Sequence, residues 1–166
     1  MIILIPGKYL IELEITRPID PKLLVIILQR FGFTDIITDP SFSASGSFAG
    51  MGKWLFMATL TRKISVRNIN GIRWTLIRKL EPAIGKRPFL LQTNSNYLLQ
   101  LTANPDSAKS NIRYGISKLG FKVPSKLLRI ASTPIKTEWI ALARWPLSPK
   151  VLRETAPLQF QQIREV

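Results

Sequence analysis

Residues 9–13 read YLIEL and residues 97–101 read YLLQL, so one pattern of tyrosine and leucine occurs twice in the chain. The tripeptides FGF at residues 31–33 and LGF at residues 119–121 repeat at the same offset. Matches that share an offset are typical of an internal repeat. The sequence therefore predicts two copies of one structural unit.

The first copy has the periodicity of a strand, a helix and two further strands. Residues 8–15 alternate apolar and polar side chains, which predicts a half-buried strand. Asp20-Pro21 supplies an N-cap and a first helical residue, and Gly32 is a helix stop. Residues 33–38 and 53–62 are rich in apolar residues and predict the next two strands.

The second copy follows the same order. Residues 97–103 predict a strand, and residues 104–106 start a helix that ends near Gly120. Residues 126–131 and 137–145 predict two more strands, the second ended by a proline.

A trailing helix is expected after each set of strands. Residues 65–80 place apolar side chains near helical spacing, although Asn70-Gly71 within them is also a hairpin signal. Residues 150–154 predict a helical turn, and residues 88–92 predict a strand between the copies.

The fold class that follows is α+β, with two tandem βαββ(α) repeats, mainly antiparallel sheets and helices on one face. This order is similar to the ferredoxin-like arrangement. The expected boundaries are residues 1–86 for the first repeat and 87–166 for the second.

The first repeat contains the longer loop, a Gly/Ser segment at residues 40–53. It looks like a phosphate-binding loop, but Ser47 stands where such a loop needs glycine, and Trp54 stands where it needs Ser or Thr. We therefore expect a strand connection and no nucleotide. Its apolar side chains are candidates for contact with a protein partner: Phe42, Phe48 and Met51.

The residue inventory argues against an enzyme. The chain has no Cys and no His, which excludes a thiol nucleophile, an imidazole base and the usual zinc ligands. Glu12 and Glu14 are a carboxylate pair, and we interpret them as an exposed polar strand face. No metal and no cofactor are expected.

No secretory signal or membrane insertion is expected either. The apolar start, residues 1–6, lacks a basic region and is shorter than a signal core. The longest apolar run, residues 23–28, is far shorter than the roughly 20 residues of a membrane span. The expected location is the cytoplasm or a virion.

The same run, LLVIIL, makes its helix apolar nearly all round. A helix that packs on one sheet buries only one stripe. The surplus side, which includes Val25 and Ile26, should therefore be covered by the second half of the chain or by another subunit.

Charge is the clearest functional signal. The chain has 24 Lys and Arg against 10 Asp and Glu, a net charge of +14. Such a field attracts polyanions and acidic protein surfaces. Residues 40–80 and 107–137 contain no acidic residue, and the candidate cations within them are Arg62, Lys63, Arg67, Arg73, Arg78, Lys79, Lys109, Arg113, Lys118, Lys122, Lys126 and Arg129.

Tryptophans are interleaved with these cations. Trp54 and Trp139 occupy equivalent positions in apolar strands, which predicts core packing for both. Trp74 and Trp145 each follow an arginine, and we expect them to be exposed, with Trp74 as a candidate for stacking on a base.

The leading hypothesis is a non-enzymatic building block of a larger assembly, of the phage virion, tail or baseplate type. Its partners would be other protein subunits with acidic surfaces. The alternative is a protein that binds single-stranded DNA or RNA through the two acid-free stretches. A third hypothesis is a metal-independent RNA-processing enzyme, because the layout is similar to that of CRISPR-type RNA endonucleases. Those enzymes often use a His and have a glycine-rich loop near the C-terminus. This chain lacks His and has Pro146, Pro149 and Pro157 in that region.

Overall fold

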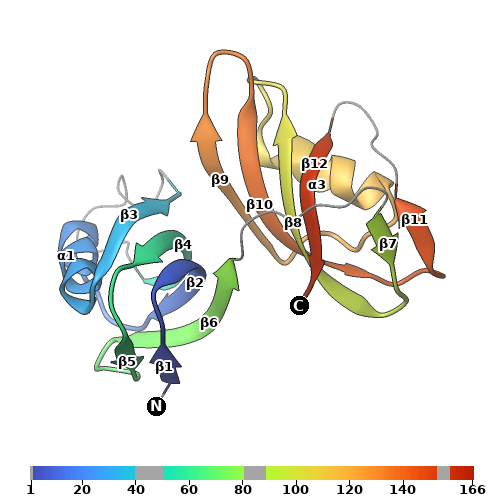
Figure 1. The fold of residues 1–166 in the computed structure, drawn as a ribbon. Helices are drawn as coiled ribbons and strands as arrows, with labels where there is room; N and C mark the ends of the chain where they lie inside the picture. Colours follow the sequence, from blue (N-terminus) through green and yellow to red (C-terminus); the bar gives the residue numbers. More distant parts are fainter. Residues whose placement is uncertain (1, 40–50, 81–88, 153–157) are drawn as a thin grey trace. The chain divides into compact units, whose positions relative to one another are not determined.

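The computed structural model of the chain describes residues 2–39, 51–80, 89–152 and 158–166. The chain divides into two compact units, Met1–Glu81 and Pro82–Val166. Within the described residues, each unit has one helix and every strand pair is antiparallel (Figure 1). The predicted α+β class with mainly antiparallel sheets is confirmed.

The first unit combines a four-stranded sheet, a two-stranded ribbon and a helix. The sheet order is β3-β4-β2-β6, and the ribbon pairs β1 with β5. The bounds are β1 Ile2–Leu4, β2 Gly7–Ile15, α1 Pro21–Phe31, β3 Phe33–Thr38, β4 Gly52–Leu60, β5 Ile64–Val66 and β6 Ile72–Leu80.

The second unit has the same elements in the same order along the chain. Its sheet order is β12-β8-β10-β9, and its ribbon pairs β7 with β11. The bounds are β7 Phe89–Leu91, β8 Ser95–Ala103, α3 Lys109–Lys118, β9 Lys126–Ser132, β10 Thr137–Trp145, β11 Lys150–Leu152 and β12 Gln159–Glu165.

Helix α1 begins and ends where the sequence predicts. The side chain of Asp20 accepts a hydrogen bond from the backbone N–H of Lys22 at 2.9 Å, which satisfies one of the free donors of the first turn. Pro21 needs no such partner, since it has no N–H. Gly32 ends the helix in a left-handed conformation, with φ of 112°.

The core of the first unit lies on one face of its sheet. Tyr9, Ile11 and Leu13 from the central strand β2 belong to it, and α1 covers them with Leu24 and Leu28. The ribbon covers the same face, because Leu4 of β1 and Val66 of β5 belong to the same cluster. The first unit is therefore a sheet with one layer on its core face, made by one helix and one ribbon.

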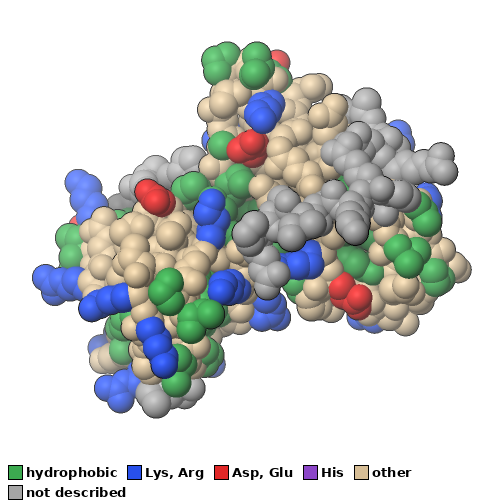
Figure 2. All heavy atoms as spheres, in the orientation of Figure 1, with side chains coloured by type: hydrophobic (Ala, Val, Ile, Leu, Met, Phe, Trp, Pro, Cys, Tyr) green, Lys and Arg blue, Asp and Glu red, His purple; other side chains and the backbone are tan. Residues whose placement is uncertain are grey.

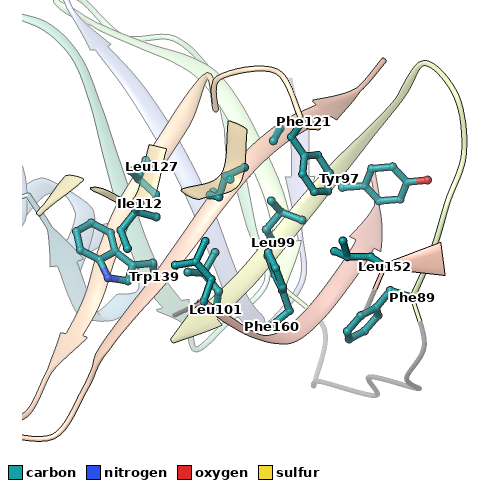
Figure 3. Close-up of a cluster of buried hydrophobic side chains, with 14 of the residues drawn as sticks. Phe89, Tyr97, Leu99, Leu101, Ile112, Phe121, Leu127, Trp139, Leu152 and Phe160 are labelled. Atoms are coloured by element: carbon teal, nitrogen blue, oxygen red, sulfur yellow. The ribbon is translucent and has the colours of Figure 1, made fainter. Parts of the chain in front are cut away.

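The second unit has a core of the same kind (Figure 3). Leu99 and Leu101 of β8 are completely buried, and Ile112 of α3 packs against them. The ribbon contributes Phe89 and Leu152.

The pairing of side chains across strands agrees between the two sheets. Tyr9 lies opposite Ala58 and Leu13 opposite Trp54. In the second sheet Tyr97 lies opposite Ala143 and Leu101 opposite Trp139. Both tyrosine hydroxyls bind backbone just before their own strands: that of Tyr9 donates to the Ile5 carbonyl at 2.7 Å, and that of Tyr97 accepts from the Gln92 N–H at 2.6 Å.

The expected helix at residues 65–80 is wrong, because this segment forms β5, a turn and β6. Ile69 and Ile72 exchange two backbone hydrogen bonds, and Gly71 turns the chain between them with φ of 88°. A bulge at Thr75 explains the misleading spacing within β6: β2 residue Leu13 pairs with Trp74, whereas Glu12 pairs with Leu76. The extra residue breaks the two-residue alternation, so the apolar positions imitate helical spacing.

The helical turn expected at residues 150–154 is also wrong where the structure describes it. Lys150–Leu152 is strand β11, paired with β7, and residues 153 and 154 lie outside the described residues. The strand expected at residues 88–92 is confirmed as β7. Strands β1 and β12 were not predicted.

Helix α3 begins later than predicted. A turn comes first, in which the Ser107 N–H donates to the Asn104 carbonyl at 3.1 Å. The helix then starts at Lys109, and the Asn111 side chain accepts from the Ala108 N–H at 2.8 Å. Asn104 and the proline after it therefore belong to a turn and not to an N-cap.

Candidate partner-binding surfaces

The outer face of α1 is apolar and open. Leu24 and Leu28 point into the core, whereas Leu23 is 51% exposed and Ile26 is 43% exposed. These two residues lie three positions apart, so they are neighbours on the helix surface. We call them the α1 outer face. Val25 beside them is half-buried.

The ribbon of the first unit adds apolar surface to the same layer. Ile2 and Ile3 of β1 are 50% and 59% exposed. Figure 2 shows hydrophobic side chains with Lys and Arg side chains around them over the part of the first unit where β1 and β5 lie. Because α1 and the ribbon cover the same face of the sheet, their outer sides belong to one surface layer.

The Gly/Ser loop is described only at its end. Met51, directly before β4, is 50% exposed. The two predicted contact residues Phe42 and Phe48 lie outside the described residues.

The carboxylate pair does not form an exposed polar face, so that expectation is wrong. Glu12 is 4% exposed and accepts a hydrogen bond from Oγ1 of Thr75 at 2.8 Å. Glu14 is half-buried and forms an ion pair with Arg73 at 3.3 Å. Leu10, on the same side of β2, is also buried. The central strand is therefore buried on both faces, and both carboxylates have partners.

Arg62 stabilises the end of α1, although the sequence placed it among the partner-binding cations. Its Nη2 donates to the Arg30 carbonyl and its Nε to the Phe31 carbonyl, the latter at 3.3 Å. These carbonyls belong to the last turn, which has no helical partners. A cation at this end also interacts favourably with the helix dipole. The local structure thus accounts for Arg62 without a partner.

Strand β6 places three more of the predicted cations at an edge of the first sheet. They are Arg73, paired with Glu14, and Arg78 and Lys79, both exposed. Charged side chains on an edge strand oppose pairing with a strand of another molecule. These residues therefore have a structural explanation as well.

The tryptophans expected to be exposed are not. Trp145 is 1% exposed and packs edge-on against Phe121 at 5.0 Å between ring centroids. Trp74 is half-buried and packs edge-on against Phe31 at 6.0 Å. Each follows an exposed arginine on a strand, and neighbouring strand residues point to opposite faces. An exposed arginine therefore puts the next side chain into the core.

The core packing predicted for the other two tryptophans agrees with their burial. Trp139 is 1% exposed, and Trp54 is half-buried and packs against the first core. None of the four tryptophans is left as a stacking platform.

Helix α3 has an outer face of a different kind. Ile112 and Ile116 are buried, whereas Arg113 and Lys118 are exposed and Tyr114 is 69% exposed. Lys122 is exposed just after the helix. We call Arg113, Tyr114, Lys118 and Lys122 the α3 outer face.

The remaining predicted cations are dispersed over their units. Lys63 and Arg67 are exposed on either side of β5. Arg129 is exposed and Lys126 half-buried on the edge strand β9, and Lys109 is half-buried at the start of α3. Among the predicted cations that the structure describes, Arg113, Lys118 and Lys122 share a short segment, residues 113–122, with an exposed aromatic ring.

Within residues 2–39, 51–80, 89–152 and 158–166 no three Asp or Glu side chains gather as metal ligands. In the same residues, neither helix has the length and apolar character that crossing a membrane requires.

Comparison of the chain with protein-family models, with curated proteins and with solved structures found no match.

Proposed function

We propose that the chain is a non-enzymatic building block of a larger assembly, and that it docks on a protein neighbour through the α1 outer face. The observation that carries the proposal is the exposure of Leu23 and Ile26 on a helix that already buries Leu24 and Leu28. Packing within the unit explains why Leu24 and Leu28 are apolar, but it does not explain why Leu23 and Ile26 are.

The second unit supplies a comparison for this helix. The offset that relates Tyr9 to Tyr97 also relates Leu23 to Asn111 and Ile26 to Tyr114. A helix in the same topological position thus tolerates polar outward residues. The apolar residues on α1 are therefore not required by the fold, and removal from water by a partner gives them a role.

We further propose that the scaffold is a tandem pair of ferredoxin-like units in which a ribbon replaces the second helix. The shared strand order and the matching tyrosine and tryptophan pairs support this. So does a second bulge: Phe160 pairs with Leu101 and Gln162 with Gln100, which leaves Gln161 as an extra residue where the first unit has Thr75. A shared bulge position is a feature that related units keep.

The partner should present an apolar patch with acidic residues around it. Lys22 and Arg30 lie on α1 beside its outer face and are exposed, and α1 contains no acidic residue. A second copy of the chain would bring the same cations together, and like charges disfavour that contact. Charge complementarity thus favours an acidic neighbour.

The two apolar side chains can supply only part of the binding energy. Each is about half exposed, and full burial of such a side chain contributes about 1.5–3 kcal/mol. Half of that for each residue gives about 1.5–3 kcal/mol together. A specific interface of about 1,200 Å² or more would surround them, with the cations steering the encounter.

Site-specific crosslinking tests the proposal. A photoreactive amino acid replaces Ile26 in the full chain, and the matched control carries it at Asn111 on α3. Irradiation in the producing cells should join position 26, and not position 111, to one protein. Leu23→Asp on the same chain should abolish that product, because it places a carboxylate in the apolar contact.

The identity of the crosslinked molecule decides the outcome. A neighbour whose contact surface carries Asp and Glu around an apolar centre supports the proposal. Crosslinks from position 26 only to another copy of the chain, only to nucleic acid, or to nothing would refute it.

A further inference from the structure

The α3 outer face combines cations with an open aromatic ring. Tyr114 is 69% exposed, and Lys118 lies one helical turn after it on the same side. Arg113 precedes Tyr114, and Lys122 follows the helix. The backbone of Lys122 is fixed, since its N–H donates to the Arg144 carbonyl at 2.9 Å. Three cationic side chains and one aromatic side chain are therefore exposed within one short segment, residues 113–122.

The fold does not account for these side chains. Ile112 and Ile116 hold α3 on the sheet from the opposite face. No acidic residue occurs between Asp106 and Glu138. The carboxylate of Glu138 forms its ion pair with Lys136, which lies outside the α3 outer face. The Ser117 hydroxyl, on the same helix, donates to the Arg113 carbonyl at 2.8 Å.

We infer that the α3 outer face binds single-stranded nucleic acid. Arg113, Lys118 and Lys122 would contact phosphates, and Tyr114 would stack on a base. An exposed ring among cations is how proteins hold single strands, because every unpaired base offers a face for stacking. In a duplex the faces of the bases are already stacked on one another, so the ring gives no such advantage there.

The exposed ring of Tyr114 also helps to decide between nucleic acid and an acidic protein as the ligand. Cations alone are sufficient to attract carboxylates, and they do not need an aromatic side chain that stands open to water. Tyr114 therefore favours nucleic acid, and its contribution is what the experiment measures. The inference is independent of docking through α1, because the two faces are on different helices in different units.

The experiment measures binding of the full chain to fluorescent 20-nucleotide oligo(dT) and oligo(U) by anisotropy over a series of salt concentrations. Tyr114→Ala should weaken binding roughly 5- to 150-fold, the measured range for loss of one stacked base, and leave the salt slope unchanged. Tyr114→Phe keeps the ring and should restore most of the affinity. A preference for one oligonucleotide would distinguish RNA from DNA, since only the 2′-hydroxyl and the base methyl differ.

Charge variants test the phosphate contacts. Arg113→Gln and Lys118→Gln should each lower the magnitude of the salt slope by about 0.7. The matched control is Lys63→Gln with Arg67→Gln, which removes two exposed cations from the first unit and should leave the slope in place. Thermal unfolding of every variant should match the parent chain, because the replaced side chains are exposed.

Three results would overturn the inference. One is the absence of binding to either oligonucleotide at low salt. Another is an equal loss of affinity in the control variant, which would mean attraction by net charge alone. The third is an affinity that Tyr114→Ala does not lower, or an affinity for a duplex of the same sequence that equals the affinity for the single strand. Either result would mean that the face binds polyanions in general.

Discussion

Replacing Arg62 by methionine tests whether this cation stabilises α1 or serves a partner. Methionine keeps an unbranched apolar side chain and removes the guanidinium, so the hydrogen bonds to the Arg30 and Phe31 carbonyls are lost. The favourable interaction between the cation and the C-terminal end of the helix dipole is lost with them.

The expected cost follows from these contacts. A hydrogen bond to a charged group contributes about 1.5–3 kcal/mol where water is excluded. Arg62 is exposed, so water competes, and about 0.5 kcal/mol for each bond is the appropriate value. The dipole interaction adds about 0.3–1 kcal/mol. Arg62→Met should therefore destabilise the first unit by about 1–2 kcal/mol.

Urea denaturation followed by circular dichroism measures this change as a lower midpoint at an unchanged slope. In a unit of this size, Met1–Glu81, the loss should appear as a fall of roughly 5–10 °C in Tm. The control is Lys63→Met, the neighbouring exposed cation, which should change stability by less than about 0.5 kcal/mol. High salt should shrink the difference between the two variants, since salt screens the dipole interaction. Equal stability of the two variants would refute the capping role and return Arg62 to the partner-binding cations.

Three further predictions concern stability and association. In chemical denaturation, Gly120→Ala should lower the free energy of unfolding by about 1–3 kcal/mol more than Gly52→Ala. Both glycines have φ above 100°, but only at Gly120 would the new Cβ lie 2.8 Å from the buried indole ring of Trp145. Equal losses for the two variants would mean that the ring moves aside. Thr137→Val should lower the free energy of unfolding by about 1–3 kcal/mol, because the buried indole N–H of Trp139 donates to Thr137 Oγ1 at 2.8 Å and would lose its partner. An unchanged denaturation midpoint would contradict this. Leu23→Gln combined with Ile26→Gln should reduce co-purification of the neighbour that position 26 crosslinks, while stability stays within about 0.5 kcal/mol; unchanged co-purification would count against the α1 outer face as a contact surface.

The sequence was informative where local chemistry and burial agree. Alternation through Tyr9, Ile11 and Leu13 marked β2, and Asp20 with Gly32 marked both ends of α1. In each case the residue types that favour the element are also the ones that the core requires. The second unit gave the same result for β10, whose bounds match the prediction.

Two kinds of element were outside the reach of periodicity. The bulges at Thr75 and Gln161 insert one residue into β6 and β12, which displaces the later apolar residues by one position. The ribbons are short, and β1 shows only three apolar residues in a row. Neither pattern carries the two-residue alternation by which a strand is recognised.

The candidate surfaces divide in the same way. Composition indicated a cationic chain, and the apolar run in α1 indicated a side that packing would not use. The sequence did not distinguish the role of Arg62, which caps a helix, from that of Lys118, which is exposed and lies one helical turn from Tyr114. Both are cations in acid-free stretches, and only the position of the backbone carbonyls distinguishes them.

The amino-acid order by itself determined the α+β class, the ends of α1 and the excess of cations, because helix caps, alternation and net charge depend on residues close together in the chain. Tertiary structure decided that Trp145 is buried, that Glu12 is buried and accepts a hydrogen bond from Thr75, and that Tyr114 is exposed. Exposure depends on which strands and helices lie on either side of a residue, and those neighbours come from distant parts of the sequence.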